Sequence, residues 1–163
     1  MKKKETDYVD GETFHTKIKK IYSGDLDWAV NKKQEHMAKV VYDHVHENTA
    51  FEDERRGKGK DFATWIFSEE EGLKENLFTT GFELMIDARL EPNASIGLHT
   101  HSRTEEIYYI LKGSVEMTTV NTNGNELRQK LRPGDAHMVR LGQSHYGTAG
   151  PDGVRFIAVA TKK

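Results

Sequence analysis

The sequence predicts an all-β domain built as an antiparallel sandwich or barrel. Short runs of β-branched and aromatic residues follow one another along most of the chain, and turn-forming residues separate them. No long amphipathic helix interrupts these runs, which argues against a parallel α/β sheet. At 163 residues, the chain suits one domain with one hydrophobic core.

The first 38 residues are polar, and we interpret them as a short, mostly helical or irregular extension before a barrel domain at 39–163. Within the extension, "TFHTKIKKIY" predicts a short helix that has Thr13 as its N-cap. The segment "KVVYDHV" at 39–45 predicts the first strand. The charged, glycine-containing stretch at 47–60 is typical of a mobile loop.

Beyond residue 60, seven apolar runs predict strands. They span 62–67, 77–90, 106–113, 114–120, 126–131, 137–141 and 154–161, and the turn residues between them are Pro92, Asn93, Asn123, Gly124, Pro133, Gly134, Gly142, Asp152 and Gly153. In the run at 106–113, alternate side chains lie on opposite faces, and both faces are apolar. We therefore expect Ile107, Tyr109 and Leu111 to need a cover, either the N-terminal extension or a second subunit.

The composition excludes several classes of function. Charged residues are 31% of the chain with a formal net charge of -2, so the strong positive field typical of nucleic-acid binding is absent. No stretch of 18 apolar residues predicts a membrane span, and we expect a soluble, cytoplasmic protein. Because cysteine is absent, any metal must be held by nitrogen and oxygen. Small molecules and further copies of the chain are the expected partners.

One short stretch, "GLHTHSRTEEIYYILKG" at 97–113, concentrates potential metal ligands. His99 and His101 lie on the same side of a strand, although two such histidines are also common on exposed strands. After a turn, Glu106 faces back toward them, whereas Glu105 points away and is expected to be a solvated rim charge. With His145 as a third imidazole, the set suits iron, manganese, nickel, copper or zinc.

These residues resemble the two motifs of the cupin superfamily. The first motif runs glycine, five residues, His-x-His, three or four residues, glutamate, six residues, glycine; here Asn93 replaces the first glycine and Gly113 is the last. The second motif is weaker, since Arg140 replaces its proline and Ala149 its asparagine. Asparagine tolerates the left-handed backbone that the first glycine serves. The resemblance covers about residues 80–160, and all four metal-ligand positions match.

The resemblance implies a small jelly-roll barrel whose two sheets enclose one divalent transition metal ion. The implied ligands are His99, His101, Glu106 and His145, and we favour iron, manganese or nickel over zinc or copper. Cupins commonly dimerise, so we expect a homodimer. Because imidazoles bind metals only when neutral, metal affinity is expected to fall below about pH 6.5.

Three further residues are candidates for catalysis, and each has an ordinary alternative. His137 could be a base beside the metal or a packed strand histidine. Tyr108 shares the face of Glu106 and could hydrogen-bond a ligand or be a core aromatic. Arg140 could clamp a substrate carboxylate or be a surface arginine.

Two other charged or histidine-rich segments have surface interpretations. We interpret "HVH" at 44–46 as an edge strand, with a second metal site as the alternative. We interpret "ERRGKGK" at 54–60 as a solvated loop, with a lid that attracts an anionic substrate as the alternative.

The leading functional hypothesis is a metal-dependent cupin enzyme that acts on a small carboxylate- or enol-bearing molecule. Oxidoreductase chemistry of the dioxygenase type is favoured, and decarboxylation, isomerisation or lyase chemistry are alternatives. The competing hypothesis is a binding module that acts as a sensor or in storage. An enzyme needs an open metal position with an acid or base nearby, whereas a structural site is closed.

Overall fold

The computed structural model describes residues 8–17, 24–25, 29–30, 32–68 and 78–163. The elements are β1 (Val9–Asp10), α1 (Gly11–Lys17), β2 (Gly24–Asp25), β3 (Ala29–Val30), η2 (Gln34–His36), β4 (Ala38–Asp43), η3 (Glu54–Arg56), β5 (Lys60–Ser68), β6 (Phe82–Leu90), β7 (Ser95–Thr100), β8 (Thr104–Val120), β9 (Glu126–Leu131), β10 (Ala136–Val139) and β11 (Ser144–Lys162). Nine strands form one curved sheet, which confirms the predicted all-β class.

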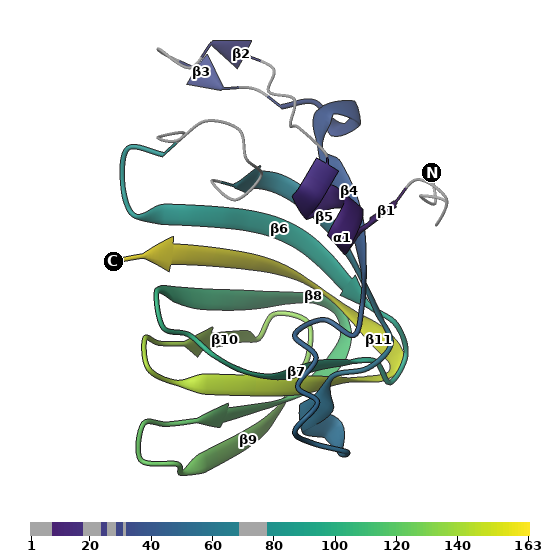
Figure 1. Cartoon of the computed structure of the whole chain (residues 1–163), viewed down its shortest axis with the longest axis vertical. Helices are drawn as coiled ribbons and strands as arrows, with labels where there is room; N and C mark the ends of the chain where they lie inside the picture. The colour runs from purple at the N-terminus through teal and green to yellow at the C-terminus, as the bar shows by residue number, and fades with distance from the viewer. Residues whose placement is uncertain (1–7, 18–23, 26–28, 31, 69–77) are drawn as a thin grey trace.

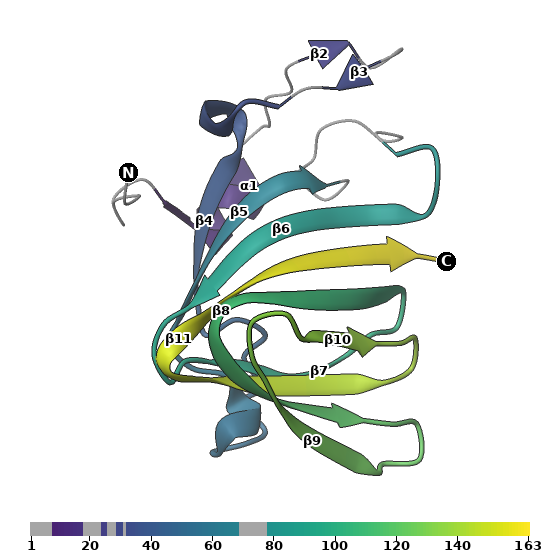
Figure 2. The same ribbon diagram turned by 180° about the vertical axis from the view of Figure 1, so that it is seen from behind.

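Two long strands, β8 and β11, join the layers of the structure. The neighbouring strands of the sheet follow the order β1-β4-β5-β6-β11-β8-β10. In addition, β7 pairs with β11 and β9 pairs with β8. Each long strand therefore contributes one half to an upper layer and the other half to a lower layer, as the views from front and back show (Figures 1 and 2). This is a jelly-roll arrangement, but hydrogen bonds between the described strands do not close the barrel.

The bend in β8 falls at Gly113, which has a φ of 74°. A Cβ atom there would overlap the carbonyl oxygen of Gly153, which also has a positive φ and lies at the matching bend of β11. The sequence predicted that Gly113 ends a strand, and this is wrong. Only glycine fits both the dihedral and the close approach, so the chain bends here and continues as one strand of 17 residues.

The N-terminal segment packs on the sheet as a mixture of elements. β1 pairs in parallel with β4, and Phe14 of α1 is buried with its ring 5.3 Å from that of Trp65. The predicted N-cap Thr13 is wrong, since the Asp10 side chain accepts a hydrogen bond from the Thr13 backbone N–H at 2.8 Å. Residues 18–22 of the predicted helix lie outside the described residues, and a mostly helical extension is not confirmed. The boundary between 38 and 39 stays a prediction.

The segment expected to be a mobile loop, 47–60, is tied down along its length. Asn48 and Arg56 join through a backbone hydrogen bond of 2.7 Å, and Lys58 and Ser95 exchange two more at 3.1 and 2.7 Å. The Arg56 guanidinium also pairs with Glu47 at 3.0 Å. The composition of the segment predicted mobility, because composition carries no information about partners that are distant in sequence, such as Ser95.

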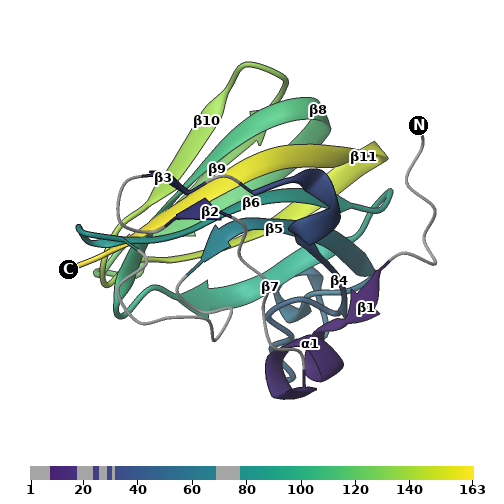
Figure 3. The same ribbon diagram turned by 90° about the horizontal axis from the view of Figure 1, so that it is seen from above.

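The predicted outward orientation of Ile107, Tyr109 and Leu111 is confirmed. Their exposed fractions are 44%, 48% and 39%, respectively. Met138 of the neighbouring β10 extends the same apolar surface. α1 and β1 lie at the opposite edge of the sheet and do not cover it (Figure 3). No helix in the described ranges is long and apolar enough to cross a membrane.

Candidate metal centre

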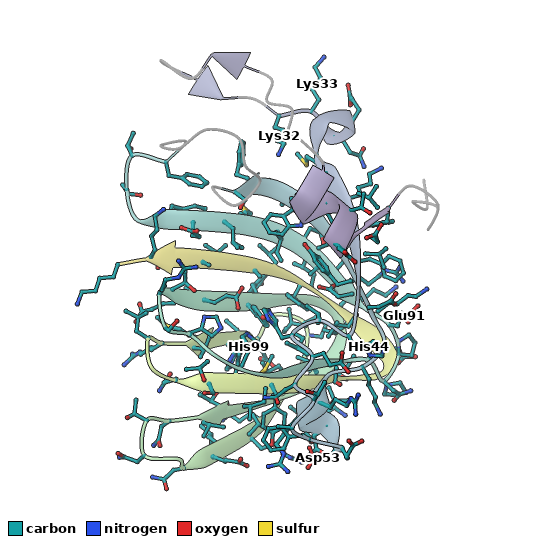
Figure 4. All side chains as sticks on the ribbon, viewed as in Figure 1. Lys32, Lys33, His44, Asp53, Glu91 and His99 are labelled. Atoms are coloured by element: carbon teal, nitrogen blue, oxygen red, sulfur yellow. The ribbon has the colours of Figure 1, made fainter. Side chains whose placement is uncertain are left out.

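The four predicted ligands come together between the two layers. His99 is on β7, Glu106 is on β8, and His145 on β11 is the cross-strand neighbour of His99. His101 follows β7 directly, in the turn that leads into β8. One ligand atom from each residue lies within 4.8 Å of the other three. Figure 4 shows the His99 side chain in the space between the strands.

The second nitrogen of each histidine has a partner that orients the ring. His99 Nδ1 donates to the Gly97 carbonyl oxygen at 2.8 Å, which fixes its proton on Nδ1 because a carbonyl can only accept. His101 Nδ1 lies 3.3 Å from the Thr104 hydroxyl, and His145 Nδ1 lies 3.0 Å from His137 Nε2. The Thr104 hydroxyl and His137 Nε2 can each accept a hydrogen bond from the Nδ1–H group. All three Nε2 lone pairs are thereby directed at one point, as metal ligands require.

The spacing of these nitrogens fits a transition metal. The three Nε2 atoms form a triangle with sides of 3.1, 3.2 and 3.2 Å. Nitrogen–metal bonds of about 2.1 Å give neighbouring donors about 3.0 Å apart in an octahedron and about 3.4 Å apart in a tetrahedron. The observed sides lie between these two values, so the triangle fits a transition metal without choosing between the two geometries.

Glu106 completes the set from the adjacent strand. Its Oε2 atom lies 3.6 Å from His101 Nε2 and 3.9 Å from His145 Nε2. The Tyr108 hydroxyl, two residues along the same face, hydrogen-bonds the Glu106 carboxylate. Glu105 does not join the cluster, so strand alternation selected the correct one of the two glutamates.

Burial keeps these imidazoles neutral. Together with the charges of neighbouring histidines, burial lowers the pKa of His99 to about 3 and that of His145 well below its ordinary value. The pKa of His101 is also lowered by burial. Neutral imidazole binds metal, so protons compete less well here than at an exposed histidine. The expected decline of metal affinity near pH 6.5 therefore moves to lower pH.

A cavity of about 650 Å³ opens beside the cluster. His99, His101 and Glu106 line it, whereas His145 is fully buried behind them. The remaining wall combines apolar and aromatic side chains with several ionisable groups, and Tyr108 belongs to it. Metal positions that the protein leaves open would face this cavity.

The other predicted site residues occupy three different places. His137 on β10 contacts His145, with ring planes 14° apart, and so lies behind a ligand rather than in the cavity wall. Tyr108 is buried, stacks on Phe156 and also lines the cavity. Arg140 is exposed and is not among the residues that line the cavity, and its role as a clamp stays a prediction.

His46 is a site residue that the sequence did not reveal. Its ring stacks on that of His99, with centroids 3.8 Å apart and planes 12° apart, and it lines the cavity. The predicted edge strand at 44–46 is wrong, because β4 ends at Asp43 and both His44 and His46 have left-handed backbones, with φ of 56° and 53°. Such φ values are uncommon outside glycine, and a packed ring explains why one is kept here.

The departures from the motifs have local explanations. Asn93 adopts the left-handed backbone that the motif glycine serves, with a φ of 60°. Ala149, in place of asparagine, is buried, and its backbone N–H donates to the Ala94 carbonyl oxygen at 2.8 Å. Neither change displaces a ligand.

Solved structures with this architecture were found by comparison. A predicted oxalate decarboxylase from Thermotoga maritima is 29% identical, with 67% of this chain and 86% of that chain covered and a TM-score of 0.51. KdgF from Halomonas sp. is 17% identical, with 63% and 79% covered and a TM-score of 0.50. An oxalate decarboxylase from Bacillus subtilis is 23% identical, with 64% of this chain and 26% of that chain covered and a TM-score of 0.54.

No curated protein matches the chain as a relative. The family model described as "Cupin" matches residues 73–163, which is more than half of the chain and includes all four residues of the metal cluster. Fold, ligand geometry and family model agree, and the chain belongs to the cupin family.

Proposed function

We propose that this protein is a metal-dependent cupin enzyme that acts on a small organic acid. The observation that carries the proposal is the cavity of about 650 Å³ with three of the four cluster residues in its wall. A metal that only stabilised the barrel would be enclosed, whereas this arrangement gives a ligand direct access.

The residues divide into those that would hold the metal and those that would support them. His99, His101, Glu106 and His145 would hold it, and the bound metal would supply Lewis-acid or redox chemistry to an oxygen-bearing substrate. His137 orients the His145 ring through Nδ1. Three imidazoles and one carboxylate suit manganese, iron or nickel, and manganese is the first to test because the Bacillus subtilis oxalate decarboxylase has Mn(II) centres.

The reaction class has two leading candidates. The sequence favoured dioxygenase-type oxidation, and the 29% identity to a predicted oxalate decarboxylase supports decarboxylation. Isomerisation and lyase chemistry are the further alternatives. Either leading reaction begins with a carboxylate or enolate at a metal position that faces the cavity.

The first experiment measures metal and turnover together. Elemental analysis of protein purified without added metal should find about one transition metal ion per chain, and His99→Ala and His145→Ala variants should lose it. Unchanged metal content in both variants would contradict the ligand assignment.

Oxygen uptake and CO2 release are then followed with a panel of small organic acids. Oxygen uptake supports oxidation, and CO2 release without oxygen uptake supports decarboxylation. Tight binding of an acid without turnover would instead support a binding module.

We also propose that the chain is a homodimer that buries the surface formed by Ile107, Tyr109 and Met138, because this exposed apolar surface lies on adjacent strands.

A further inference from the structure

One carboxylic acid in the cavity wall has an oxygen atom without a hydrogen-bond partner. Asp61, on β5, is 6% exposed, and its Oδ1 atom has no hydrogen-bond partner within the described ranges. The Arg89 backbone N–H hydrogen-bonds the carboxylate, but this leaves Oδ1 unsatisfied. Buried polar atoms are nearly always paired, so an unpaired carboxylate oxygen in a cavity wall indicates a missing donor.

The other acids of the cavity wall differ from Asp61. Glu83 Oε2 also lacks a hydrogen-bond partner, but it forms an ion pair of 3.1 Å with Lys162 Nζ, and Glu106 belongs to the ligand cluster. Asp43 is exposed to solvent. Within the described residues, Asp61 is therefore the buried acid of this wall that has an unpaired oxygen and no ion pair.

Asp61 and the metal cluster lie in the wall of the same cavity, so one bound molecule can contact both. β6 and β11 separate β5 from β8, which carries Glu106. At the roughly 30 Å³ that a water molecule occupies in the liquid, a cavity of about 650 Å³ holds roughly 20 non-hydrogen atoms. Oxalate, the smallest dicarboxylic acid, would fill a small part of it.

The wall between the two ends is apolar and aromatic. Trp65, Ile86 and Phe156 contribute to it. A ring or hydrocarbon body fits such a wall better than a second charged group does.

We propose that Asp61 is a specificity-determining residue that accepts a hydrogen bond from a hydroxyl group of the substrate. The proposal rests on the proposed function, because the acidic end of the same molecule would lie at the metal centre. The substrate class is a hydroxylated organic acid with an apolar or aromatic body, larger than oxalate. Burial raises the pKa of Asp61 to about 7, and the Arg89 backbone N–H and the Arg89 charge oppose this rise only in part.

The test uses two probes that differ in one hydroxyl group, para-hydroxyphenylpyruvate and phenylpyruvate. Both present a keto acid to the metal, and the first alone has a distant hydroxyl. Calorimetric titration of Mn²⁺-loaded protein should show at least tenfold tighter binding of the hydroxylated probe, because the Asp61 oxygen is buried and otherwise unpaired.

Variants of Asp61 should remove this preference in steps. Asp61→Asn keeps an acceptor oxygen without the charge and should reduce the preference, while Asp61→Leu should reduce it to less than twofold. Asp87→Asn is the matched control, since that carboxylate on β6 pairs with Arg155 and does not line the cavity. Manganese content should be the same in all four proteins.

Three outcomes would overturn the proposal: equal affinity of the wild type for both probes, an undiminished preference in Asp61→Leu, or no binding of either probe by metal-loaded protein. Failure of the proposed function is a separate result, seen as absence of bound metal before any probe is added.

Discussion

Replacement of His137 by phenylalanine should weaken metal binding although His137 is not itself a ligand. His145 Nδ1 lies 3.0 Å from His137 Nε2, and the two rings stack with planes 14° apart. Phenylalanine keeps the ring and the stacking but removes the acceptor. No hydrogen bond then stabilises the His145 tautomer that carries its proton on Nδ1, which is the tautomer that presents the Nε2 lone pair to the metal.

The magnitude follows from the burial of His145, which is fully buried. An unpaired buried donor costs about 1–3 kcal/mol. Removal of a hydrogen-bond partner behind a metal ligand typically lowers affinity by about 10- to 100-fold, which corresponds to about 1.4–2.8 kcal/mol. The two ranges overlap, so we expect a 10- to 100-fold increase in the dissociation constant for Mn²⁺.

The assay is competition with a chelator of known affinity, at pH 7.5, with circular dichroism as a check of folding. His137→Gln retains an acceptor and should recover part of the affinity. Met138→Ala changes an exposed neighbour on the same strand and should bind as the wild type does. A folded His137→Phe protein whose affinity stays within threefold of the wild type would refute the role of His137 in positioning His145.

Three other predictions concern the same structure. Glu106→Gln should reduce manganese affinity by more than about tenfold in the same competition assay, and Glu105→Gln by less than about twofold, since only Glu106 reaches the cluster; equal losses would contradict this. Burial holds the pKa of His137 at about 4, below the ordinary 6.5, so the unfolded chain binds more protons than the folded chain as pH falls from 6.5 toward 4. The metal-free protein should therefore lose up to roughly 1.4 kcal/mol of unfolding free energy per pH unit from this histidine, measured as urea midpoints, and a flat profile above pH 5 would exclude this linkage. Tyr109→Lys should convert the proposed dimer to monomers in light scattering with metal content unchanged, and a monomeric wild type would rule the dimer out.

The ligand set could be predicted from the sequence because its rules are local. Strand alternation places His99 and His101 on one side and chooses Glu106 over Glu105, and both choices hold in the structure. The motif spacing added His145, which lies beside His99 as a cross-strand neighbour. The same local rule placed Tyr109 on the outer face.

The rest depends on contacts that are distant in sequence. His46 is distant in sequence from His99. The His-x-His pattern at 44–46 does not distinguish a strand from the turn with left-handed backbones that places the His46 ring on the His99 ring. The bend at Gly113 is required by Gly153, a residue on another strand. Asp61 directly precedes the apolar run at 62–67, and the pattern of that run gave no sign that Asp61 lines the cavity of the metal centre.

Metal binding and folding are coupled in this protein by the geometry of its histidines. Three Nε2 lone pairs converge with separations of 3.1–3.2 Å, and lone pairs at that distance repel one another unless a cation or a proton lies between them. Burial disfavours the proton, because it lowers the pKa of His99 to about 3. A metal ion therefore relieves the repulsion, and it does so only in the folded chain, where β7, β8 and β11 hold the ligands together. An ion present at 100 times its dissociation constant would add about 2.7 kcal/mol to the free energy of unfolding, so the cluster that weakens the metal-free fold strengthens the loaded one.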